Sequence, residues 1–81
     1  MKVRLIAFAG LRELLGAPVR ELDLRDGATL ADIWPGLVHE RPQFAPLERS
    51  TRLALNGKLA GTEAQLAEGD EVALMPPFGG G

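Results

Sequence analysis

The C-terminal stretch constrains the fold most, because a strand pattern there runs directly into two prolines and three glycines. Residues 71–75 form an apolar, strand-like run, and Pro76 and Pro77 follow it. Proline fixes φ and donates no backbone N–H, so sheet pairing has to stop at this point. The glycines beyond carry no Cβ and leave the backbone thin and unrestricted. The sequence therefore predicts a folded domain over residues 1–75 and a flexible tail, Pro-Pro-Phe-Gly-Gly-Gly, over residues 76–81.

The predicted tail has a chemical group at its tip, the α-carboxylate of Gly81. From Pro76 to Gly81, at roughly 3.3 Å per residue, the tail reaches about 20 Å, enough to enter a pocket on another protein. A free carboxylate is a poor acyl donor, but a partner that uses ATP to form an acyl-adenylate makes attack by a sulfur nucleophile easy. Glycine leaves the approach to that carbonyl unhindered. The simplest alternative is a frayed chain end, since disorder concentrates at termini.

Composition excludes several classes of function. A chain of 81 residues has room for one small core, and 46% hydrophobic and 25% charged residues are typical of a soluble globular protein. The net charge of −2 provides no basic surface for nucleic acid or for an anionic membrane. No apolar stretch approaches the roughly 18 residues of a membrane span. The absence of cysteine excludes disulfides and thiolate sites and fits a cytoplasmic location.

Apolar periodicity predicts a small α+β domain. Strands are expected over residues 2–9, 18–24, 52–55, 58–60 and 71–75. Asn56-Gly57 is the signature of a tight hairpin, because both positions of such a turn need positive φ. A short helix over 11–15 ends at Gly16, and a longer helix begins near Thr29. The first and last strands are the most apolar, so we expect them side by side in the middle of one mixed sheet, with a helix packed across one face.

Three stretches interrupt the regular pattern. Pro35-Gly36 lies inside the apolar stripe of the longer helix, so a kink or an early break is expected there. Residues 41–48 contain Pro42 and Pro46 and are predicted to be loop. Residues 61–68 are predicted to be irregular, with Leu66 as their core anchor.

No group of side chains in the domain indicates catalysis. His39 is the only histidine, and without cysteine or a second histidine it cannot build a typical zinc site. Ser50 and Thr51 have no evident base, and the carboxylates are scattered through turns and strand edges. The glycines form no phosphate-binding pattern. We therefore expect a chain that is no enzyme on its own and that binds no metal and no cofactor.

Four segments together resemble one known family. They are Phe-Ala-Gly-Leu-Arg-Glu-Leu at 8–14, Asn-Gly-Lys-Leu at 56–59, Leu-Ala-Glu-Gly-Asp-Glu-Val at 66–72 and Pro-Pro-Phe-Gly-Gly-Gly at 76–81. This set resembles the small, sulfur-carrier subunit of molybdopterin synthase (MoaD-type), which shares the ubiquitin-like β-grasp fold with the thiamine sulfur carrier (ThiS-type). The Phe-Ala-x-x-Arg-Glu and terminal Pro-Pro-x-x-Gly-Gly motifs favour the molybdopterin branch.

The resemblance implies a role in molybdenum cofactor biosynthesis. Gly81 would be adenylated by an E1-like adenylyltransferase that uses ATP, and a sulfur donor would convert it to a thiocarboxylate. The tail would then enter the large subunit (MoaE-type) of a heterotetrameric synthase and donate sulfur to cyclic pyranopterin monophosphate. The catalytic residues of that reaction are expected on the large subunit.

The resemblance also implies partner-binding residues. Phe8, Leu59 and Met75 fall where the family has an apolar docking patch, and Arg12 falls where it has a polar contact. The simplest alternative is that Phe8 and Met75 are ordinary core residues. The tail would contribute the remaining partner-binding residues, which are Pro76, Pro77, Phe78, Gly79 and Gly80.

Other functions fit the same residues. The chain could be a ubiquitin-like protein modifier, whose Gly81 becomes joined to lysines of other proteins, or a sulfur carrier for thiamine or for tRNA thiolation. Both need the same activated tail. A third possibility is a non-covalent interaction module with an inert tail. The sequence leaves these alternatives open.

Overall fold

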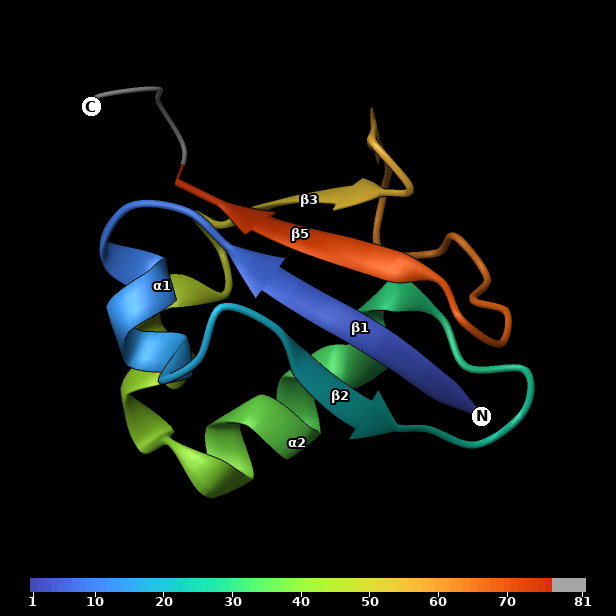
Figure 1. The fold of residues 1–81 in the computed structure, drawn as a ribbon, viewed down its shortest axis with the longest axis horizontal. Coiled ribbons are helices and arrows are strands. Elements are labelled where there is room, and N and C mark those ends of the chain that lie inside the picture. Colours follow the sequence, from blue (N-terminus) through green and yellow to red (C-terminus); the bar gives the residue numbers. More distant parts are fainter. Residues whose placement is uncertain (77–81) are drawn as a thin grey trace.

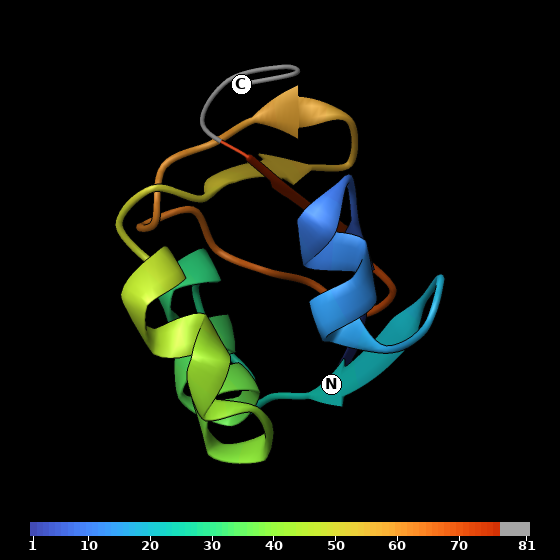
Figure 2. The ribbon, with the colours of Figure 1, turned by 90° about the vertical axis from the view of Figure 1, so that its left-hand side faces the viewer.

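The computed structural model describes residues 1–76 and folds them into one mixed sheet with helices on one face (Figures 1 and 2). The strands are β1 (Lys2–Ala7), β2 (Arg20–Asp23), β3 (Arg52–Leu55), β4 (Lys58–Leu59) and β5 (Glu71–Met75). Their order is β2-β1-β5-β3-β4, in which β1 and β5 are parallel and all other neighbours are antiparallel. This confirms the predicted β-grasp sheet with the first and last strands in the middle.

The helix-facing side of the two central strands supplies much of the core. Val3, Leu5 and Ala7 of β1 and Val72 and Leu74 of β5 are buried in one cluster with side chains of the helices. Full burial of a leucine or valine side chain contributes roughly 1.5–3 kcal/mol. The strand that leads to the tail is therefore held in the best-packed part of the domain.

The helices begin and end where local chemistry predicts. α1 (Gly10–Leu15) follows β1 and ends at Gly16, whose φ of 84° suits glycine in a helix C-cap. A 3-10 turn, η1 (Leu30–Asp32), leads into α2 (Ile33–Glu40). The Asp32 carboxylate accepts the Thr29 backbone N–H at 2.8 Å, the reciprocal bond of a capping box. This confirms the predicted helix start at Thr29.

A kink or an early break was expected at Pro35-Gly36, and the early break is wrong, because α2 runs through both residues. Pro35 lies in the first turn of α2, where a backbone N–H has no partner within the helix, so its missing N–H costs little. Gly36 faces the sheet, and a Cβ at this position would come within 3.3 Å of the Leu22 side chain. The glycine therefore allows α2 to approach β2 closely.

Other boundaries also differ from the expectation. Residues 41–48 are not plain loop, because a 3-10 helix, η2 (Pro42–Leu47), occupies most of them and buries Phe44 completely. Proline suits the first position of such a helix, since its φ is already helical. The first strand ends at Ala7 because Ala9 adopts a φ of 54° ahead of α1. Within residues 1–76, no helix is long and apolar enough to cross a membrane.

Candidate functional site

The face of the sheet opposite the helices carries an apolar patch near the end of β5. Side chains that alternate with the core positions point to this face, and Figure 2 shows no described helix covering it. Strand register places Ile6 opposite Ala73, Ala73 opposite Ala54, and Ala54 opposite Leu59. Phe8 and Met75 continue the same alternation at the ends of β1 and β5. We define the apolar patch as Ile6, Phe8, Ala54, Leu59, Ala73 and Met75; Ala54 and Ala73 are buried, and the exposed area comes mainly from Phe8 and Leu59.

The other half of this face is charged. The register places Lys2 opposite Asp23 and Arg4 opposite Glu21. Arg4 also lies 3.8 Å from the Glu71 carboxylate on β5. Opposite charges that face each other across strands contribute roughly 0.2–1 kcal/mol per pair. These charges balance one another within the sheet, which leaves the apolar half as the surface available to a partner.

The structure brings three of the predicted partner-binding residues onto the patch. Phe8 is 49% exposed and Leu59 is 63% exposed, which is unusual for large apolar side chains. Phe8 is therefore not a core residue, and Met75 is only partly buried. Arg12 is exposed on α1, which Figure 1 shows beside the ends of β1 and β5. That these residues bind a partner stays a prediction.

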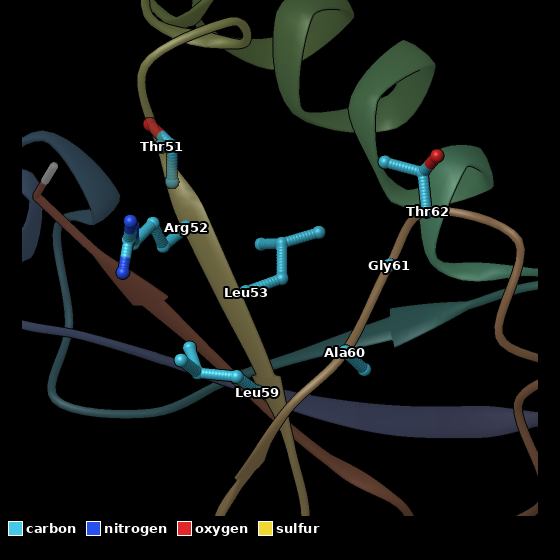
Figure 3. Close-up of a pocket in the computed structure, with 7 residues that line it drawn as sticks. All are labelled: Thr51, Arg52, Leu53, Leu59, Ala60, Gly61 and Thr62. Atoms are coloured by element: carbon cyan, nitrogen blue, oxygen red, sulfur yellow. The ribbon is translucent and has the colours of Figure 1, made fainter.

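Four residues of this surface were missed by the sequence reasoning. Arg52 is paired with Met75 in the strand register, and Figure 3 shows its side chain leaving β3 on the side of Leu59, opposite to Leu53. Ile6 was detectable, because strand alternation places it on the same face as Phe8. Ala54 and Ala73 required the register between β3 and β5, which no local pattern specifies.

The base of the tail lies beside the patch. Pro76 is the last described residue, and it lines a shallow groove with Gly10, Leu11, Leu47, Ser50 and Thr51. The Ser50 and Thr51 hydroxyls both donate to the Leu47 carbonyl oxygen, at 3.3 and 2.7 Å, so they end η2 and have no sign of a nucleophilic role. Pro77, Phe78, Gly79, Gly80 and Gly81 lie outside the described residues, and the predictions made for them stay predictions.

Two arginines that form no ion pair within residues 1–76 lie near the apolar patch. Arg4, Arg20 and Arg25 form ion pairs with Glu71, Glu40 and Asp32, respectively. Within residues 1–76, no ion pair involves the remaining arginines, which are Arg12, Arg41, Arg49 and Arg52. Arg52 is paired with Met75 in the strand register, and Arg12 belongs to α1, which Figure 1 shows beside the ends of β1 and β5. This end therefore presents apolar area together with positive charge.

Metal ligation finds no support in the described part of the chain. Among residues 1–76, no group of three or more His, Cys, Asp and Glu side chains could hold a metal ion. His39 is exposed near the end of α2.

Comparison with known proteins relates the whole chain to sulfur carriers. The ThiS family profile matches residues 5–81. The molybdopterin synthase sulfur carrier subunit of Chlamydomonas reinhardtii is 30% identical, with 100% of both chains covered. The subunit of the same name from Arabidopsis thaliana is 31% identical and covers 100% of this chain and 84% of its own length.

Solved structures share the fold. A putative molybdopterin converting factor, subunit 1, from Pyrococcus furiosus has a TM-score of 0.86 and 26% identity, covering 96% of this chain and 99% of its own. Small archaeal modifier protein 1 from Haloferax volcanii has a TM-score of 0.83 and 27% identity, covering 95% and 98%. A chain from the complex of subunits 1 and 2 of the Helicobacter pylori molybdopterin-converting factor shows the fold alone, at 21% identity and a TM-score of 0.70 over 100% of both chains. The profile match and the two relatives at 30% and 31% identity show that this chain belongs to the ThiS family.

Proposed function

We propose that this chain is the sulfur carrier subunit of a molybdopterin synthase. The observation that carries the proposal is the match, over all of this chain, to relatives named for that role. The fold supports it by placing an exposed apolar patch and the base of the tail at one end of the domain. A carrier needs this combination, because the surface recognises the partner while the tail reaches into it.

The root of the tail is anchored on both sides. Met75, the last residue of β5, is paired with Arg52 of β3. On the other side, Leu74 is paired with Ala7 of β1 and accepts a hydrogen bond from the Phe8 N–H. Ordering a residue on binding costs roughly 1–2 kcal/mol. A rigid root limits that cost to the residues beyond Pro76.

The chemistry of the proposal takes place on the Gly81 carboxylate. An oxygen of this carboxylate attacks the α-phosphorus of ATP on an E1-like adenylyltransferase, and pyrophosphate leaves. Hydrosulfide released by a donor then attacks the carbonyl carbon, AMP leaves, and a thiocarboxylate remains. No step requires a cofactor bound by this chain, because the partner holds the ATP. We place these reactions in the cytoplasm, where ATP and such partners are available.

The second partner in the proposal is the large subunit of the synthase (MoaE-type). It would take the thiocarboxylate into its own active site, supply the catalytic residues, and pass the sulfur to cyclic pyranopterin monophosphate within a heterotetramer. The assembly of subunits 1 and 2 in the Helicobacter pylori factor supports such a partner. We expect the partner surface to be apolar opposite Phe8 and Leu59, and acidic opposite Arg12 and Arg52.

A protein modifier is the second candidate. The likeness to small archaeal modifier protein 1 is the observation that favours this second function. The two chains share the fold over nearly their full lengths, so the same scaffold could serve either function. The two functions differ in what attacks the activated Gly81. A sulfur donor produces a thiocarboxylate, whereas a lysine amine on another protein produces an isopeptide bond.

Intact mass spectrometry separates the candidates. The chain is incubated with the adenylyltransferase, ATP and a sulfur donor, with a variant lacking Gly81 as the control. A mass gain equal to sulfur replacing oxygen, absent from the control, supports the carrier, and adducts on lysines of other proteins support the modifier. An unchanged mass contradicts both. Conversion of cyclic pyranopterin monophosphate by the sulfurated chain with the large subunit then tests the molybdopterin pathway against the thiamine and tRNA pathways.

A further inference from the structure

Asn56 joins the hairpin between β3 and β4 to the turn before β5. Its side-chain Nδ2 donates to Oδ1 of Asp70 at 3.0 Å, and its Oδ1 accepts the Glu71 backbone N–H at 2.9 Å. The other carboxylate oxygen of Asp70 accepts the Ala67 N–H at 2.7 Å. The Asn56 backbone N–H also donates to the Glu71 carbonyl oxygen at 2.8 Å. We call this set of bonds the Asn56 clasp.

The orientation of the Asn56 amide is fixed by the clasp itself. A backbone N–H can only donate, so the atom that faces Glu71 is the amide oxygen. The NH2 group therefore faces the Asp70 carboxylate, which can only accept when it is ionised. Both ends of the amide are satisfied in this orientation, and neither would be if the amide were turned over.

The residue after Asn56 is Gly57, and both have positive φ, 50° and 87°, as the tight turn requires. Asparagine followed by glycine is chemically labile, because the glycine nitrogen has no neighbouring side chain to hinder its attack on the asparagine side chain. Asn56 is also the only asparagine in the chain. Any asparagine deamidation of this protein therefore occurs here.

We propose that Asn56-Gly57 is a deamidation site that the native clasp suppresses, and that deamidation opens the clasp. In the reaction the Gly57 backbone nitrogen loses its proton to water and bonds to Cγ of Asn56. The bond between Cγ and Nδ2 breaks, and ammonia leaves. Water then opens the resulting succinimide at either carbonyl, which gives aspartate or isoaspartate at position 56. Water is the only co-reactant.

The clasp suppresses the first step because it holds both ends of the amide that has to react. Ring closure expels the NH2 group, so it breaks the bond to Asp70 and leaves that carboxylate without its donor. Thermal opening of the turn is therefore required before reaction. The rate of deamidation thus reports how often the β3–β4 hairpin detaches from the start of β5.

The products of deamidation also keep the clasp open. An aspartate at position 56 places a second carboxylate where the NH2 group stood, 3.0 Å from Oδ1 of Asp70. Like charges at this separation repel. Isoaspartate has a further effect, because it lengthens the backbone within a turn whose length sets the strand register. The hairpin that loosens carries Leu59, so the modification reaches the apolar patch.

Incubation of the native protein, followed by intact mass spectrometry, tests the suppression. We expect the native protein to deamidate at least about tenfold more slowly than the chain unfolded in denaturant, by the fraction of time the turn is open. Asp70→Ala should speed the native reaction severalfold, and Glu48→Ala, which removes an exposed carboxylate elsewhere, should not. Equal rates in the native and unfolded chains would overturn the proposal.

Two further variants separate the clasp from general stability. Leu37→Ala, a core variant on α2, lowers stability away from the clasp, so it should deamidate more slowly than Asp70→Ala when both are compared at the same interval below their own unfolding midpoints. Asn56→Asp should lower the midpoint by about 4–8 °C, the shift for loss of one well-made hydrogen-bonded pair in a domain this size. Asn56→Asp with Asp70→Asn exchanges donor and acceptor and should restore most of that loss. Failure of this rescue, or a Leu37→Ala rate equal to that of Asp70→Ala, would refute the role of the clasp.

Discussion

The Phe8 backbone N–H donates a hydrogen bond to the Leu74 carbonyl oxygen at 3.1 Å. β1 and β5 therefore stay paired up to the residues just before Pro76. The side chains of the two residues have opposite environments, since Leu74 is fully buried and Phe8 is 49% exposed. The hydrogen bond therefore links a residue of the core to a residue of the apolar patch, near the root of the tail.

Replacing Phe8 by alanine should weaken partner binding and leave the fold intact. The substitution removes a large exposed apolar side chain from the patch, and such a residue at the centre of an interface contributes about 1–3 kcal/mol, or roughly five- to 150-fold in Kd. The free energy of unfolding should change by less than about 0.5 kcal/mol, as for surface substitutions generally. Calorimetric titration with the large subunit measures the first quantity, and denaturant unfolding measures the second.

Leu5→Ala is the matched control, because Leu5 lies on the same strand and faces the core at 1% exposure. It should lower the free energy of unfolding by about 2–5 kcal/mol, through lost burial and the cavity left behind. Were Phe8→Ala to destabilise the domain as much as Leu5→Ala does, Phe8 would belong to the core. Normal affinity of Phe8→Ala for the large subunit would remove it from the interface.

Arg52→Gln should slow association with the partner at low salt. Arg52 has no ion pair among the described residues and lies opposite Met75 at the patch, so its charge is free to attract an acidic surface. The association rate should fall severalfold at low ionic strength, and the difference should vanish near 1 M salt, where the Debye length is about 3 Å. Lys2→Gln removes the same charge at the opposite end of the sheet. Stopped-flow rates that respond equally to both variants would argue against a positively charged rim.

Local signals in the sequence were enough for most of the fold. Asn56-Gly57 identified the hairpin, the Thr29 and Asp32 pair identified the helix start, and the strand at 71–75 was predicted with the bounds that the structure shows. What these signals share is that each acts within a few residues. The central position of β1 and β5 followed from their apolar composition, because the most apolar strands go to the middle of a sheet.

The remaining errors depend on relationships that local signals do not contain. A proline in the first turn of a helix and one in its interior look alike in sequence, and only the position of the first helical residue distinguishes them. Here the 3-10 turn before Ile33 puts Pro35 in the first turn of α2. The patch was incomplete for a similar reason, since Ala54 and Ala73 join it through a register that spans the sheet.

Pro35→Ala should therefore be close to neutral. An interior proline would cost about 3 kcal/mol, and its removal would stabilise the domain by that amount. In the first turn, the substitution should instead destabilise by about 0.4–1 kcal/mol, because alanine gives the unfolded chain more freedom. Val38→Pro places a proline inside the same helix and should cost about 3 kcal/mol or more. Denaturant unfolding that shows a gain of several kcal/mol for Pro35→Ala would mean that α2 is strained there.

The double variant Pro76→Gly, Pro77→Gly tests whether the tail is held ready for its partner. Proline reaches the bound state with φ already fixed, whereas glycine loses the most conformational freedom on ordering. At about 0.4–1 kcal/mol per position, with glycine adding to it, the loss of affinity for the large subunit should be about tenfold, carried by a less favourable binding entropy.

Alanine at both positions separates entropy from contact. Pro76 lines the groove with Leu11 and Leu47. Part of any loss of affinity for the large subunit therefore comes from the contacts of the missing proline ring. This part is the same for alanine and glycine, because neither carries the ring. The part of the loss that is due to the conformational freedom of the unbound tail differs between alanine and glycine. The affinities should therefore fall in the order proline, alanine, glycine. Unfolding free energies should stay within about 0.5 kcal/mol of each other, because β5 ends before the substitutions. Equal affinities for the alanine and glycine variants would show that the prolines act by contact, and the tail would then gain nothing from being stiff.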